Sequence, residues 1–174
     1  MTWLWIVGGV VVSLGFVAFT GAPYVPSKRR DIRQAFTELY SLSEHDTLVD
    51  IGSGDGVVLR QARQFGARAV GYEIHPLLVV ISRWLSRHDD GVTIRLANFW
   101  QTKLPDETTV VYTFGDSRDI AKMYRRVEVE AQRLGRTLHL ISYGFAVKDK
   151  KPADQAGAYY LYKIKPLQRQ LRNV

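Results

Sequence analysis

The residues best suited to chemistry form a glycine-rich turn with two acidic side chains. A short apolar run, Leu48 to Ile51, leads into Gly52-Ser53-Gly54-Asp55-Gly56, and Asp50 lies two positions before the first glycine. Glycine permits positive φ and lets a ligand lie against the main chain. Three glycines at alternate positions therefore predict a strand that ends in a ligand-binding loop.

The charge and spacing of this turn limit the ligand. Phosphate-binding turns offer backbone N–H groups and a helix N-terminus to an anion, which Asp50 and Asp55 would repel. The spacing is also G-x-G-x-G rather than the dinucleotide pattern G-x-G-x-x-G. A cationic ligand is favoured, and S-adenosylmethionine fits because it carries a sulfonium and an ammonium and has no phosphate.

A third acidic residue follows at the spacing of a βαβ unit. Residues Ala67 to Glu73 read as the second strand, and Glu73 lies about twenty positions after Gly52, where it can accept both ribose hydroxyls. Either element alone has a plain explanation, since a glycine loop can be a simple turn and an acid at a strand end is often solvated. Together, in this order, they predict an adenosine-type cofactor.

The acceptor side should lie beyond the fourth strand, Thr109 to Phe114. Gly115 and Asp116 follow its carboxyl end, where doubly wound sheets place reacting groups, so Phe114 and Gly115 are candidate substrate residues. Asp116 is the candidate catalytic residue, because it could orient an amine or help to remove its proton. The alternative is that Asp116 caps the helix beginning near Ser117.

These residues require a Rossmann-like, doubly wound α/β fold. We expect a mostly parallel sheet of about six strands, with its last strand, Tyr159 to Ile164, antiparallel to the fifth, Thr137 to Tyr143. The dozen or so polar residues between them leave no room for a helix, and 148–152 should form an exposed basic loop. One apolar stripe at helical spacing is expected to pack on the sheet as core; it comprises Leu77, Val80, Ile81, Trp84 and Leu85.

The amino-acid composition limits the kinds of domain, site and partner further. The 174 residues, 46% of them apolar, suit one globular domain, and the absence of cysteine excludes disulfides and a cysteine nucleophile. The four histidines show no metal-ligand spacing, so no metal is expected. A net charge of +7 indicates an anionic partner, which could be nucleic acid or the inner face of a membrane.

The N-terminal segment indicates that the anionic partner is a membrane rather than nucleic acid. Residues 1–27 contain no charge, and Thr2 to Ala22 is long enough to cross a hydrocarbon core of about 30 Å as one transmembrane helix. Lys28, Arg29 and Arg30 follow, which places the catalytic domain on the cytoplasmic side. A cleaved signal peptide is the alternative, although it would carry basic residues before the apolar run. The expected organisation is 1–22 transmembrane helix, 23–45 proline-containing hinge and amphipathic helix, 46–164 cofactor-binding domain and 165–174 basic tail.

Several motifs also follow one another in a recognisable order. They are Pro23-Tyr24-Val25-Pro26, Val49-Asp50-Ile51-Gly52-Ser53-Gly54-Asp55-Gly56, Gly71-Tyr72-Glu73, Ser82-Arg83, Asn98-Phe99-Trp100 and Phe114-Gly115. The glycine loop and Glu73 resemble the class I S-adenosylmethionine-dependent methyltransferases. With the apolar N-terminus, the whole set resembles the membrane-anchored protein-lysine methyltransferases, whose mitochondrial members act on the adenine nucleotide translocase and on the ATP synthase c-subunit.

The resemblance implies roles for further residues. Asn98 stands where the family usually has an aspartate that accepts a hydrogen bond from the adenine amine, and an asparagine carbonyl can accept the same bond. Phe99 would then line the purine or simply pack in the core. Tyr24 would cover the ligand or belong to a rigid linker. The implied partner is a membrane-associated protein that presents a lysine.

Three rival functions remain open from the sequence. The acceptor could be a lipid or small amphiphilic amine, or the chain could be a non-catalytic, membrane-tethered interaction module. A nucleic-acid methyltransferase is disfavoured because the basic residues cluster beside the apolar segment and no Asn/Asp-Pro-Pro-aromatic motif follows the fourth strand.

Overall fold

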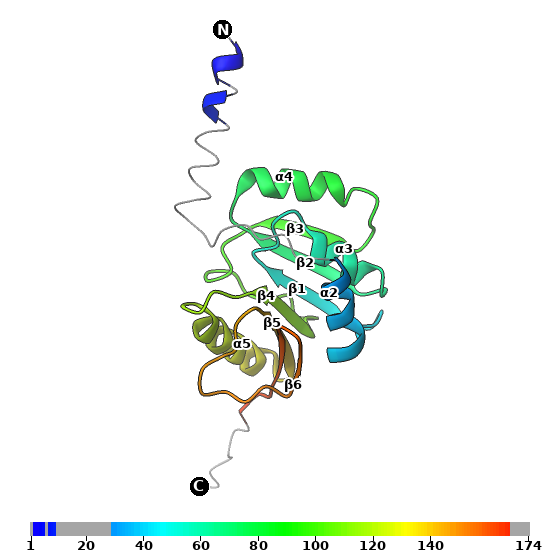
Figure 1. Ribbon diagram of the computed structural model, residues 1–174, viewed down its shortest axis with the longest axis vertical. Helices are drawn as coiled ribbons and strands as arrows, with labels where there is room; N and C mark the ends of the chain where they lie inside the picture. The colour runs from blue at the N-terminus through cyan, green and yellow to red at the C-terminus, as the bar shows by residue number, and fades with distance from the viewer. Residues whose placement is uncertain (1, 6, 10–28, 168–174) are drawn as a thin grey trace.

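The computed structural model describes residues 2–5, 7–9 and 29–167 (Figure 1). Most of the expected transmembrane helix 1–22, the hinge with Tyr24, and the tail beyond Leu167 lie outside the described residues. The N-terminal residues that are described are helical, and Trp3, Leu4, Trp5 and Val7 are exposed. Among the described residues, no helix combines the length and the apolar character needed to cross a bilayer.

The domain is built on one seven-stranded sheet with the strand order β3-β2-β1-β4-β5-β7-β6. The first five strands pair in parallel, and β7 pairs antiparallel with β5. The strand order reverses between β1 and β4, which is where doubly wound sheets bind ligands. The strands are β1 (Thr47–Ile51), β2 (Arg68–Glu73), β3 (Val92–Leu96), β4 (Val110–Phe114), β5 (Leu138–Tyr143), β6 (Asp154–Ala156) and β7 (Tyr159–Ile164).

Helices cover both faces of this sheet (Figure 1). One hydrophobic cluster joins the sheet to α2 (Arg29–Gln34), the π-helical turn η1 (Ala35–Leu39), α3 (Val57–Arg63) and α4 (Pro76–Leu85). The other cluster lies under α5 (Ile120–Leu134). Successive strand residues point to opposite faces, so Leu48 belongs to the first cluster and Val49 to the second.

The antiparallel return of the last strand is confirmed, and the structure adds one strand to it. β7 pairs with β5 from Leu138↔Ile164 to Tyr143↔Tyr159, as predicted from the short connection. The three-residue β6 was missed because Asp154 and Gln155 are polar and exposed, and β6 pairs only with β7. Such a short edge strand carries too little pattern to be read from the sequence.

The prediction for the apolar stripe of α4 is wrong. Leu77, Val80, Ile81, Trp84 and Leu85 are 46%, 62%, 37%, 62% and 37% exposed, respectively. The helix instead buries Val79 and Ser82 against the domain. Spacing alone predicts which residues share a helix face, whereas it cannot tell whether that face meets the sheet or the outside of the molecule.

The amphipathic helix before β1 is confirmed over its described part. Ile32, Phe36 and Leu39 are buried, whereas Arg29, Arg30 and Arg33 are exposed. This helix closes one face of the sheet because Phe36 contacts the rings of Phe65 and Tyr112 at centroid distances of 6.0 and 6.3 Å.

Candidate active site

The predicted site residues of four strands meet at one edge of the sheet. Asp50 pairs in register with Gly71 on one side and Tyr112 on the other, and Glu73 pairs with Leu96. The Ala97 N–H then donates to the Glu73 carbonyl at 2.9 Å, which brings the Asn98 turn to the same edge. Because parallel strands share their carboxyl ends, these residues lie together at the switch point, where doubly wound sheets bind ligands.

Backbone hydrogen bonds hold the glycine loop against β2, and there is free space beside Gly52. Gly52, Gly54 and Gly56 have φ values of +74°, +53° and +79°, which other residues adopt only at a cost. The Gly52 and Ser53 N–H groups both donate to the Tyr72 carbonyl, at 2.8 and 3.1 Å. A side chain at Gly52 would meet no described atom within 4 Å, so this part of the loop has room for a ligand.

Close contacts explain why Gly71 and Gly56 have no room for a side chain. A Cβ on Gly71 would lie 2.5 Å from Ser53 Oγ and 2.6 Å from Leu59 Cδ1. A Cβ on Gly56 would lie 2.3 Å from Ser82 Oγ. The loop thus packs directly on β2 and α4. The Ser53 hydroxyl is buried beside Gly71 and has no hydrogen-bond partner within the described ranges.

Glu73 connects the loop to the helix that follows β2. Its Oε2 accepts a hydrogen bond from the Gly54 N–H at 2.9 Å, and its Oε1 accepts one from the His75 N–H at 2.8 Å. A carboxylate has about four lone-pair sites, so both oxygens keep capacity for the hydroxyls of a ribose. The side chain fits the predicted role and also braces the site.

Asp50 is nearly enclosed, with only 3% of its surface exposed. Burial, followed by the nearby charges of Glu73 and Asp55, raises the pKa of its carboxyl group well above the usual range. A cationic group placed beside Asp50 would favour the ionised form and reverse this shift. This arrangement fits a ligand that brings positive charge.

The Asp55 side chain lies at the junction between the glycine loop and α3. Its Oδ1 accepts the Val57 N–H at 3.1 Å at the start of α3, and its Oδ2 lies 3.5 Å from Arg60 Nη2. The Asp55 carbonyl also accepts a hydrogen bond from Arg60. The charge of Asp55 therefore acts on Asp50 from beside the loop, while its own hydrogen bonds stabilise the loop-to-helix junction.

The predicted adenine side lies at the ends of β2 and β3. Asn98 is exposed, and its Oδ1 accepts the Trp100 N–H at 3.0 Å, which leaves one lone pair for a ligand. Phe99 is only 4% exposed and packs in the cluster under α5, which favours the core reading. Ile74, 44% exposed beside Glu73, supplies apolar surface at this edge.

On the acceptor side, Asp116 is held by Arg118. Its Oδ2 lies 2.6 Å from Arg118 Nη2, and its Oδ1 accepts the Arg118 N–H at 2.9 Å. These hydrogen bonds lower the pKa of Asp116 to about 2. Its carbonyl accepts the N–H groups of Asp119 and Ile120 at the start of α5. The Asp116 carboxylate thus holds the turn before α5, whose N-cap is Asp119, rather than capping the helix, and it is a weak base.

Sequence reasoning missed an aromatic wall beside Gly115. Phe114 pairs in register with Tyr143, and their ring centroids are 5.3 Å apart. The Tyr143 ring also lies 4.6 Å from that of Tyr159. Aromatic faces attract alkyl-ammonium groups. Tyr143 could have been found from its place at the carboxyl end of the strand next to Phe114.

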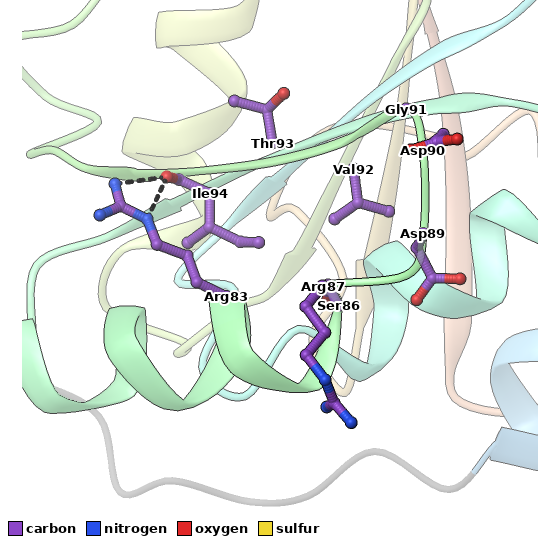
Figure 2. A pocket seen from close by; sticks show the side chains of 9 residues that line it. All are labelled: Arg83, Ser86, Arg87, Asp89, Asp90, Gly91, Val92, Thr93 and Ile94. Atoms are coloured by element: carbon purple, nitrogen blue, oxygen red, sulfur yellow. Dashed lines mark hydrogen bonds between the residues drawn. The ribbon is translucent and has the colours of Figure 1, made fainter.

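One open hollow of about 420 Å³ lies elsewhere (Figure 2). It is formed between the end of α4 and the amino-terminal half of β3, where Arg83 donates to the Ile94 carbonyl from Nε at 3.1 Å and Nη2 at 2.8 Å. It therefore lies away from the carboxyl edge that carries Glu73. No cluster of three or more His, Asp or Glu side chains in the part of the chain that the structure describes is placed to hold a metal.

Comparison with known proteins identifies the family of the chain. The family model described as the ANTKMT methyltransferase domain matches residues 50–154, from Asp50 to the start of β6. The chain belongs to this family. The predicted kinship with lysine methyltransferases of adenine nucleotide translocase and the ATP synthase c-subunit is thereby confirmed.

This ANTKMT-family chain is similar to several curated proteins. It is 29% identical over 145 residues to the Xenopus laevis lysine N-methyltransferase of the ATP synthase c-subunit, covering 76% of this chain and 63% of that protein. For the human protein of the same name, the identity is 30% over 139 residues, with 73% and 58% covered. The adenine nucleotide translocase lysine N-methyltransferase of Mus musculus is 33% identical over 88 residues, covering 48% of this chain and 38% of that protein. The chain thus spans less than two thirds of the relatives' length.

Among solved structures, an RNA methyltransferase from Salinibacter ruber in complex with S-adenosyl-L-homocysteine is similar with a TM-score of 0.73 and 28% identity. The match covers 81% of the ANTKMT-family chain and 94% of the other. The 23S rRNA methyltransferase ErmE has a TM-score of 0.54 at 17% identity and supports the fold alone. The predicted Rossmann-like methyltransferase fold is confirmed.

Proposed function

We propose that this chain is an S-adenosylmethionine-dependent methyltransferase that modifies a lysine of a membrane-associated protein. The observation that carries the proposal is the family match, which begins at Asp50 and includes the glycine loop, Glu73, Asn98 and Asp116. The names of the curated relatives support a lysine acceptor.

The carboxyl edge of the sheet would hold the cofactor. The buried carboxyl group of Asp50 would ionise beside a positively charged partner, which the cofactor would supply. The space beside Gly52 would give the methionine part of the cofactor room against the main chain. Glu73 would accept the ribose hydroxyls, and Ile74 with Asn98 would contact the adenine. The similar structure with bound S-adenosyl-L-homocysteine supports this ligand class.

When bound, S-adenosylmethionine supplies an electrophilic methyl group on a sulfonium. The residues of the chain then have to orient a neutral amine in line with that methyl and keep water away. Phe114 and Tyr143 form an apolar wall beside Gly115 for the lysine stem. Burial there would lower the lysine pKa, so that the ammonium gives its proton to solvent as the side chain enters and before the methyl group is transferred. Asp116, with its pKa of about 2, would attract the incoming ammonium rather than remove its proton.

The membrane part of the proposal rests on the N-terminal segment. Thr2 to Ala22 carries no charge, and the exposed Arg29, Arg30 and Arg33 follow it. We expect this segment to anchor the chain as a single span, with the domain on the cytoplasmic side. Tyr24 would lie between the anchor and the cofactor.

Methyl transfer to RNA is the second candidate function. The RNA methyltransferase from Salinibacter ruber is matched over 94% of its length, and the net charge of +7 suits nucleic acid. The basic residues beside the apolar segment favour the membrane reading over this one.

One experiment separates these functions. The full chain in detergent is incubated with methyl-tritiated S-adenosylmethionine and a membrane fraction that also contains RNA, and the label is counted in protein, lipid and RNA. We expect label in protein, recovered as methyl-lysine after hydrolysis, and none with Asp50→Ala. Label in RNA or lipid would overturn the lysine assignment. No transfer, together with no cofactor binding by calorimetry, would overturn the methyltransferase proposal.

A further inference from the structure

The outer face of α4 is an apolar surface that the fold leaves uncovered. We define the α4 face as the exposed apolar residues that share this side of the helix and the adjoining strand end. They are Leu77, Val80, Ile81, Trp84, Leu85 and Leu96. In Figure 1, α4 lies across the upper end of the domain, with α5 near the opposite end. Soluble domains rarely expose an apolar patch of this kind without a partner.

Arg83 and Arg87 are the charged residues on α4 and just after it, and the acidic Asp89 and Asp90 follow in the next turn. From Ile74 to His88 the sequence contains no acidic residue, whereas Arg83 and Arg87 are present and exposed. The Arg87 guanidinium lies 4.8 Å from the centroid of the Trp84 ring, and its Nη1 donates to the Trp84 carbonyl at 2.8 Å. An exposed indole with a cation beside it is suited to the boundary between lipid headgroups and acyl chains.

The α4 face also adjoins the candidate active site. Ile74 directly follows Glu73, and Leu96 pairs with Glu73 in the sheet register. A surface that covered this face would therefore lie next to the candidate cofactor site. An amphipathic helix with an apolar face and basic neighbours binds in the plane of an anionic membrane surface.

We propose that the α4 face docks on an anionic lipid bilayer and turns the candidate active site at the carboxyl edge toward the membrane. The inference rests on the proposed membrane association of the chain and adds the surface that contacts the lipid. It differs from the anchor, because a tether at 2–22 alone would leave the orientation of the domain free.

The absence of cysteine allows a direct test with the full chain. Val80→Cys, at a position 62% exposed on α4, is labelled with the polarity-sensitive dye NBD. The matched control is Val129→Cys, at a position 57% exposed on α5. Each labelled chain is reconstituted in vesicles of phosphatidylcholine with phosphatidylglycerol, and flotation measures how much chain the vesicles carry.

We expect the dye at position 80 to shift to the blue, to brighten severalfold, and to be quenched by nitroxides on the acyl chains, while the dye at position 129 stays in water. Phosphatidylcholine alone should reduce the signal at position 80 without reducing flotation. If the chain floats but the two dyes behave alike, the docking proposal fails and the anchor stands. If the chain does not float, both fail.

Two other occupants would also overturn the proposal. Coverage by the chain's own N-terminal segment would make the dye at position 80 bright without vesicles and insensitive to lipid nitroxides. A second copy of the chain would make the brightness depend on protein concentration. In both cases methyl transfer can still be measured separately from docking, because Val80 lies outside the residues assigned to the cofactor.

Discussion

The carboxylate of Glu73 accepts a hydrogen bond from the backbone N–H of Gly54, with 2.9 Å between Oε2 and nitrogen. An acid expected to bind a ribose therefore also fixes the middle of the glycine loop. The same side chain reaches the His75 N–H at the entrance to α4. Glu73 is thus expected both to bind the ribose and to stabilise the loop.

Replacing Glu73 should cost both stability and cofactor affinity. Glu73→Ala leaves two N–H groups without their acceptor, which should lower the free energy of unfolding by about 1–3 kcal/mol. Glu73→Gln keeps one amide oxygen and should lose less. Both variants should bind S-adenosylmethionine at least about tenfold more weakly. Urea unfolding and calorimetry measure the two effects, and the exposed Glu107→Ala serves as control. Unchanged stability in Glu73→Ala would contradict the bracing role.

Asp50 should make the unliganded protein less stable as pH rises. Because its pKa is raised in the folded state, the folded protein holds the Asp50 proton more tightly than the unfolded chain does. Stability from this group is therefore present below the unfolded pKa of about 4 and is lost as pH rises through the higher folded pKa.

Asp50→Asn removes this effect. The variant should be more stable than the parent at neutral pH and should bind S-adenosylmethionine at least about tenfold more weakly, since the acidic partner of the cation is gone. Urea unfolding of both proteins at several pH values measures the slope. An identical loss of stability with pH in the parent and in Asp50→Asn would show that another group is responsible.

Asp116 should not govern the pH dependence of methyl transfer. Hydrogen bonds from the Arg118 side chain and backbone lower its pKa to about 2, so the carboxylate is ionised throughout the neutral range. Single-turnover rates of Asp116→Asn should be severalfold lower, with a pH profile of the same shape as the parent's. Loss of one limb of the profile would instead identify Asp116 as a general base. Arg118→Gln provides the comparison, because it raises the Asp116 pKa and keeps the carboxylate.

Gly71→Ala should displace the glycine loop. The new Cβ would lie 2.5 Å from Ser53 Oγ and 2.6 Å from Leu59 Cδ1, distances that the neighbours can relieve only by moving. We expect a destabilisation of about 1–3 kcal/mol and a clear loss of cofactor affinity. Gly135→Ala is the control, since its φ of +65° carries backbone strain and no described atom lies within 4 Å. It should lose stability while binding the cofactor normally.

Much of the site was predictable because its elements are local. The run from Leu48 to Gly56 contains its own strand, turn and helix start, and Glu73 follows at the length of one crossover. The alternation of Leu48 and Val49 between the two cores follows from strand geometry. Such features need no knowledge of distant contacts.

The features that could not be predicted depend on contacts between distant parts of the chain or on side-chain conformation. The contact of Phe114 with Tyr143 arises from pairing between strands separated by all of α5. The bond from Asp116 to Arg118 is short-range, yet its effect on the pKa depends on exact rotamers. The exposure of α4 depends on which elements end up beside it, and helical periodicity is the same for a buried and an uncovered face.

The far edge of the sheet has a consequence for how a substrate approaches. β6 contains only the three residues Asp154–Ala156, and Pro152 comes shortly before it. A polypeptide that sought to extend the sheet there would find a short template with an acidic residue at its start, which disfavours strand addition and fibrous self-association. We therefore expect recognition of another protein at that edge to use side chains rather than a shared backbone ladder.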